Sequence, residues 1–122
     1  DRPVPVTTRE LIRKFEKLVP GFAGFWNSGD NLFVHADGSA TLHGVCARFG
    51  YFFEEQAAQL SAAQLDELFA EIEFYLRGQT EDDPLDNALC TCFLETIAGT
   101  PAGQIAKPHL GPKALRYFTA WG

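Results

Sequence analysis

Residues 31–47 read NLFVHADGSATLHGVCA, and this stretch decides the fold class that the sequence predicts. Two short β-prone runs, residues 31–36 and 40–47, flank Asp37-Gly38, a dipeptide typical of tight hairpin turns. We therefore predict that the two runs pair as antiparallel strands. Because an isolated hairpin is only marginally stable in water, helices must cover one of its faces. The predicted fold class is α+β.

Helical patterns lie on both sides of the predicted hairpin. Upstream, Thr7 and Glu10 have capping-box spacing and predict the start of a helix that ends at Pro20. Apolar residues recur on one face of that helix at helical spacing. Downstream, residues 49–60 predict a short helix.

Three further helices are predicted in the second half of the chain. Ser61 and Gln64 form another capping-box signature, and Gly78 is a plausible end for the helix that follows. Asp83-Pro84 is a natural N-cap and first-turn pair for a helix that reaches Gly99. Residues 99–112 have a loop-like composition, and the last predicted helix covers residues 113–120.

The length of 122 residues fits one domain. We expect a single α+β domain over residues 1–122, in which a small antiparallel hairpin or sheet packs against about five helices. Residues 1–7 contain two prolines and are predicted to form an extended arm. A composition of 46% hydrophobic and 21% charged residues is that of an ordinary globular protein and not of a disordered one.

No apolar run approaches the roughly 20 residues of a membrane-spanning helix, and no signal-peptide pattern opens the chain. The chain contains no Met, so we expect it to be processed, trimmed or tag-derived. Its three cysteines follow no disulfide framework and indicate reduced thiols. The expected compartment is the cytoplasm.

The charge of this chain is strongly segregated along the sequence. Residues 54–95 contain eleven acids and one base, a net charge of −10, whereas residues 1–53 carry +1 and residues 96–122 carry +3. A one-signed negative surface repels nucleic acids and anionic membranes and attracts a basic partner. We therefore expect neither nucleic acid nor membrane as a partner.

The helix predicted after Ser61 carries acids without the Lys residues that usually balance them at i, i+4. The simplest interpretation is a solvated helix face. The alternative is that a basic protein partner compensates these like charges. On that interpretation, the partner-binding residues are Glu67, Glu71, Glu73, Glu81, Asp82 and Asp83, with Tyr75 or Trp26 as an aromatic anchor.

The histidines and cysteines give no strong sign of chemistry. A two-residue turn at Asp37-Gly38 would place His35 and His43 on opposite faces of the hairpin, whereas a three-residue loop would place them on one face. Neither register brings a Cys or an acid to a known metal-ligand spacing. A Cys46–His43 nucleophilic pair would need an orienting group and a pocket. We therefore predict no metal, no cofactor and no catalytic residue.

Cys90 and Cys92 lie two positions apart on a predicted helix, about 200° around its axis, so they cannot chelate one ion together. The glycines of residues 21–29 have neither the spacing nor the following Lys of a phosphate-binding loop. The aromatic residues in that segment are expected in the core and in turns.

Three segments, LFVHADGSATLHGV (32–45), NALCTCFLETI (87–97) and HLGPKALRYF (109–118), resemble small bacterial immunity-type proteins that accompany polymorphic and contact-dependent toxins. The resemblance implies a small, acidic, cytoplasmic protein that is not an enzyme. Such a protein neutralises a cognate toxin by covering its active site or a nearby surface. It implies no particular binding residue, because these families diverge at the interface.

Two other functions remain open at this point. One is an intracellular adaptor or homodimer that uses an apolar contact near Phe118 and Trp121. The other is a small ligand-binding domain or enzyme that uses the histidines and the Gly-rich aromatic segment. The leading hypothesis is an immunity protein that covers a basic toxin domain with an acidic surface.

Overall fold

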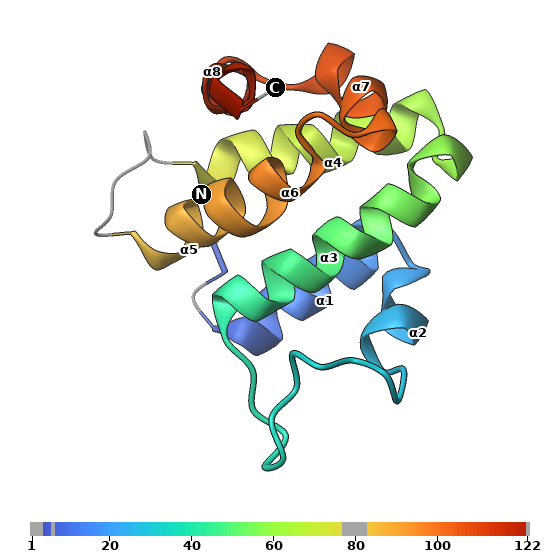
Figure 1. Cartoon of the computed structure of the whole chain (residues 1–122), viewed down its shortest axis with the longest axis vertical. Helices are drawn as coiled ribbons and strands as arrows, with labels where there is room; N and C mark the ends of the chain where they lie inside the picture. The colour runs from blue at the N-terminus through green and yellow to red at the C-terminus, as the bar shows by residue number, and fades with distance from the viewer. Residues whose placement is uncertain (1–3, 6, 77–82, 122) are drawn as a thin grey trace.

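A computed structural model describes residues 4–5, 7–76 and 83–120 and the backbone of Trp121. Within these residues all regular structure is helical, and none of them forms a strand (Figure 1). The prediction of an α+β fold is therefore wrong. None of the helices in the described part of the chain is both long and apolar enough to span a membrane.

The segment predicted as the second strand is the start of the longest helix described. Helix α3 covers Leu42–Gln56, and the Thr41 hydroxyl accepts a hydrogen bond from the Gly44 backbone N–H at 2.9 Å. Val45, Phe49 and Phe52 recur at helical spacing and are all buried. The helical repeat of apolar residues continues far beyond residue 47. It therefore determines the structure of residues 42–47, although their composition is β-prone.

The segment predicted as the first strand lies in a loop, residues 27–41, that projects from the helices (Figure 1). Asp37-Gly38 does form a tight turn, with hydrogen bonds from His35 N to Ser39 O (2.8 Å) and from Gly38 N to His35 O (2.9 Å). Gly38 has a φ of 87°, which favours glycine. The turn ends after these bonds, and no strand pairing extends it.

Other helix starts agree with the sequence signals. Both capping boxes are present, at the start of α1 (Thr8–Leu18) and of α4 (Ala62–Tyr75). The Asp83 carboxylate accepts from the first backbone N–H groups of α5 (Pro84–Ala88). Beyond α5 the chain continues as a π-helical turn, η2 (Leu89–Leu94), and as α6 (Glu95–Ile97). The predicted stop at Gly78 lies outside the described residues.

Two predicted irregular segments are helical. Helix α2 covers Phe22–Trp26, and α7 covers Pro101–Ala106 inside the segment predicted as a loop. Thr100 caps α7, and Pro101 occupies its first turn. Asp83 and Pro84 have the same arrangement at the start of α5. The short turns η1 (Ala57–Gln59) and η3 (Lys107–His109) and the last helix, α8 (Pro112–Trp121), complete the described structure.

Helix α3 lies at the centre of the fold. It packs against α1 and α2 on one side and against α5, η2 and α6 on the other, while α8 contacts α4 and η2 (Figure 1). Buried phenylalanines fill the space between these helices. The Phe15 and Phe49 rings stack with centroids 3.9 Å apart, and Phe53 meets Phe69 edge-on at 5.6 Å.

Arg48 anchors the projecting loop to α3. Its side chain is largely buried, and the Nη2 amino group of its guanidinium donates to the Phe25 carbonyl oxygen at 2.8 Å and to Asp30 Oδ1 at 3.0 Å. The guanidinium also lies 3.8 Å from the centroid of the Phe25 ring. The Ser28 hydroxyl and Arg48 hold the pKa of Asp30 below its usual value. A buried base thus fixes the start of the loop.

Candidate functional site

Glu71 is a structural acid. It is buried, and its Oε2 accepts a hydrogen bond from the Tyr75 hydroxyl at 2.6 Å. Lys14, on α1, places its Nζ 3.7 Å from the same oxygen. Tyr75 has no exposed surface. Neither residue is therefore available to a partner in this structure, although both were predicted contacts.

Glu73 has a structural role at the start of α8. Its two carboxylate oxygens accept from the backbone N–H groups of Lys113 (2.8 Å) and Ala114 (3.0 Å). The Lys113 ammonium group donates to the Leu76 carbonyl oxygen nearby. A Cβ on Gly111 would lie 2.5 Å from the Glu73 carboxyl carbon, so glycine leaves room for this cap. Helices α1 and α8 thus supply the compensating groups that α4 itself lacks.

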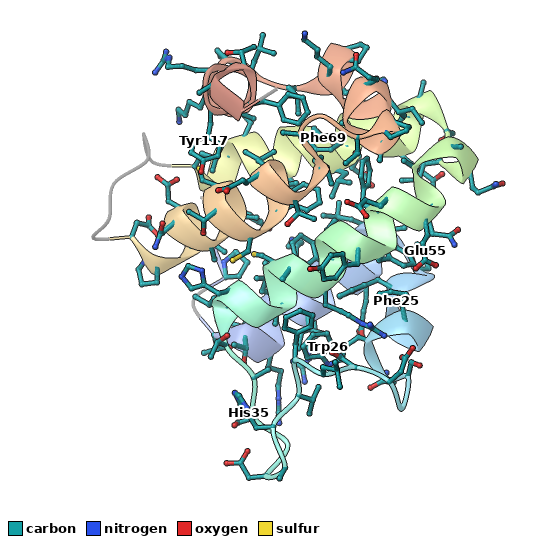
Figure 2. The ribbon with its side chains drawn as sticks, viewed as in Figure 1. Phe25, Trp26, His35, Glu55, Phe69 and Tyr117 are labelled. Carbon is teal, nitrogen blue, oxygen red and sulfur yellow. The ribbon has the colours of Figure 1, made fainter. Side chains whose placement is uncertain are left out.

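Four acids remain exposed around the connection between α3 and α4: Glu54, Glu55, Asp66 and Glu67. We call them the α3–α4 acidic face. Figure 2 shows Glu55 at the end of α3, directed away from the core into which Phe69 points. Asp66 Oδ1 lies 2.5 Å from His109 Nδ1. Within the described residues, the other three make no hydrogen bond or ion pair.

The sequence around this face contains no compensating base, since residues 49–76 have neither Lys nor Arg. Phe74 is 36% exposed and lies seven residues after Glu67, which is about two turns along the same side of α4. Phe74 is not among the predicted contacts, because the adjacent Tyr75 was expected to be the aromatic contact. The spacing from Glu67 along the helix indicates which of the two aromatic residues, Phe74 or Tyr75, lies on the same side as that exposed acid.

The remaining predicted contacts have mixed positions. Asp83 is half-buried and caps α5, while Glu81 and Asp82 lie outside the described residues. Trp26 is only 8% exposed and packs beside Phe22. Phe118, predicted as an exposed apolar contact, is 2% exposed and belongs to the core.

The histidines lie on three separate elements. His35 is on the projecting loop, as Figure 2 shows. His43 is in the first turn of α3, and His109 is in η3. No group of three or more potential metal ligands occurs in the described part of the chain. The question of hairpin register does not arise, because His43 is helical.

A sulfur contact does involve one histidine. His43 Nδ1 lies 3.2 Å from the Sγ of Cys92, and not of Cys46, the partner considered from the sequence. Cys46 and Cys90 are buried. Burial raises the pKa of both thiols. The Cys90 thiol also donates a hydrogen bond to Asp86, and the two effects together raise its pKa to about 12.

An open groove of about 430 Å³ lies between α1 and the projecting loop. Arg9 and Arg13 border it on one side, and Ser39 borders it on the other. Trp26 forms part of its wall, and Figure 2 shows this residue at the base of the loop that carries His35. No histidine occurs among the described residues that line the groove. The groove is therefore distinct from the acidic face and from the His43–Cys92 contact.

Comparison of the chain with protein-family models, with curated proteins and with solved structures finds no match. Function must therefore be inferred from the chain's own residues. Two arrangements stand out among those described: the α3–α4 acidic face and the His43–Cys92 pair.

Proposed function

We propose that this chain is a cytoplasmic, non-enzymatic binding protein of the immunity type, which covers a basic surface of a cognate bacterial toxin. The α3–α4 acidic face makes the contact. The observation that carries this proposal is the exposure of four carboxylates within a stretch of 28 residues, 49–76, that has no Lys or Arg. Such a surface favours a cationic partner and repels nucleic acid and anionic lipid.

The contact set differs from the one that the sequence predicts. Glu71 and Glu73 stabilise the fold, and so does Tyr75. Glu54 and Glu55 take their place, and Phe74 replaces Tyr75 as the aromatic anchor. Aromatic residues surrounded by charged rims are frequent centres of binding energy.

The acids act mainly on association. Exposed charges contribute little to the free energy of a bound complex, but they raise the rate at which oppositely charged partners meet. Salt screens this attraction, with a Debye length of about 8 Å at physiological ionic strength. The complex should therefore form faster at low salt than at high salt.

The test compares two variants that have the same net charge. The face variant is Glu54→Gln, Glu55→Gln and Glu67→Gln. The control variant is Glu10→Gln, Glu16→Gln and Asp37→Asn, on α1 and the projecting loop, and it keeps side-chain acceptors at the capping box and the turn. Each variant removes three negative charges from the net charge of −6.

Each protein is immobilised and used to capture partners from a lysate of the source cell, at low and at high salt. The product of the neighbouring gene is tested directly in the same way. We expect a basic partner that the wild type and the control variant retain at low salt and that the face variant loses. A partner that both variants retain equally would contradict the proposal, as would capture that does not respond to salt.

A further inference from the structure

The contact between His43 and Cys92 joins two elements that are far apart in the sequence. His43 Nδ1 and Cys92 Sγ lie 3.2 Å apart, on the first turn of α3 and on the π-helical turn η2. The Thr91 hydroxyl is 3.6 Å from the same sulfur. A thiol this close to an imidazole nitrogen is in the arrangement by which a base activates a cysteine.

The packing of α3 on η2 fixes this geometry. Gly50 is buried where α3 meets η2 and α6, and a Cβ there would lie 3.0 Å from Thr96 Cγ2 and 3.4 Å from the Cys92 carbonyl oxygen. The Thr96 hydroxyl donates to that carbonyl at 2.8 Å. Thr41 sets the start of α3 and so the position of His43. Single π-helical turns within α-helices are frequent at functional sites.

The other two thiols do not share these properties. Cys46 is completely buried and Cys90 is 2% exposed, whereas Cys92 is partly exposed and His43 is exposed. Burial raises the pKa of Cys46 and Cys90, so both stay protonated at neutral pH. Small reagents can therefore reach one thiol, and that thiol has a base beside it.

We propose that Cys92 is the reactive thiol of this chain, and that it forms a mixed disulfide with small-molecule disulfides, with His43 as its proton acceptor. Nδ1 accepts the thiol proton when the neutral imidazole carries its own proton on Nε2. The Cys92 sulfur attacks one sulfur of the reagent, and the reagent's S–S bond breaks as the new one forms. The leaving thiolate takes the proton from His43, so one disulfide is exchanged for another without a further oxidant.

The test follows the native, fully reduced chain with dithiodipyridine in excess, and the released thiopyridone reports the rate. We expect one fast-reacting thiol in the native protein and all three in denaturant. Peptide mass analysis should place the fast reaction on Cys92. Oxidised glutathione, used as a second probe, should modify the same residue. The Cys92→Ser variant should lose the fast reaction.

His43→Gln tests the role of the base, and His35→Gln on the projecting loop is its matched control. His43 lies within reach of the thiol proton and accepts it as the sulfur attacks, so His43→Gln should slow the reaction on the order of tenfold or more. His35→Gln should react like the wild type. Continued protection of Cys46 and Cys90 shows that each variant is folded, and His43→Asn serves as a second variant if it is not.

Two results would overturn the proposal. One is equal rates for His43→Gln and His35→Gln, which would mean that Cys92 is accessible but not activated. The other is a fast reaction of the native chain at Cys46 or Cys90.

Discussion

Gly103 is a residue at which the fold leaves no space for a side chain. A Cβ there would overlap the Ile97 carbonyl oxygen and would lie 2.9 Å from Phe118 Cζ. The backbone oxygen cannot move away without disturbing the end of α6 and the Thr100 cap, because the Thr100 hydroxyl also donates to it at 2.6 Å. Helices α6, α7 and α8 thus converge on a position that only glycine fits.

We predict that Gly103→Ala lowers the free energy of unfolding by about 1–3 kcal/mol, the usual range for overpacking a core. Gly24→Ala is the control, since nothing lies within 4 Å of a Cβ at that helical position. Alanine there should stabilise the protein by roughly 0.5–1 kcal/mol through its helix propensity. Urea denaturation midpoints check both values, and equal midpoints would show that the helices are not packed as described.

Helix α4 combines acids that stabilise the fold with acids that remain exposed. Glu73 faces α8 and caps it, whereas Glu67 is exposed on another side of the helix. The distinction matters for function, because an acid that the fold does not need can be substituted without a loss of stability. A substitution at each position separates the two roles.

We predict that Glu73→Ala destabilises the chain by about 0.5–2 kcal/mol, the cost of losing a helix cap. Glu67→Ala should change stability by less than about 0.5 kcal/mol, as surface substitutions usually do. Denaturant titration measures the difference. Hydrogen exchange at the Lys113 and Ala114 amides should also accelerate in Glu73→Ala. The assignment of the cap would be wrong if these amides exchanged at the wild-type rate.

The predicted helix starts were correct where the capping residues and the apolar pattern lie close together in the sequence. Ser61 and Gln64 form a complete capping box, and the apolar residues of α4 follow it at helical spacing. Thr41 caps α3 with Gly44 three positions later, so the acidic half of a capping box is missing and the start of α3 is less evident. A short apolar run without a clear capping signal does not indicate whether the segment is a strand or a helix.

The candidate site was harder to predict because its partners are distant in sequence. Glu73 contacts residues 40 and 41 positions away, and His43 contacts a cysteine 49 positions away. No local pattern encodes such pairs. The charge segregation was evident in the sequence, but the tertiary packing decides which acids remain exposed.

At the scale of the whole molecule, the central observation is that helices alone build the described core. The far-UV circular dichroism spectrum should therefore be dominated by helix. Amide NMR should give no ladder of amide–amide contacts of the kind that paired strands show between residues 31–36 and 40–47, although the Phe33 side chain does pack on Gly44. A ladder of that kind would restore the hairpin and would contradict the position of His43 on α3.

The most direct test of the proposed function is the association rate of a captured basic partner, measured against salt for the wild type, the face variant and the control variant. We predict that the face variant associates more slowly at low salt, that the difference shrinks at high salt, and that the control variant follows the wild type. If both variants slowed association equally, the effect would come from net charge alone, and the α3–α4 acidic face would not be the binding surface.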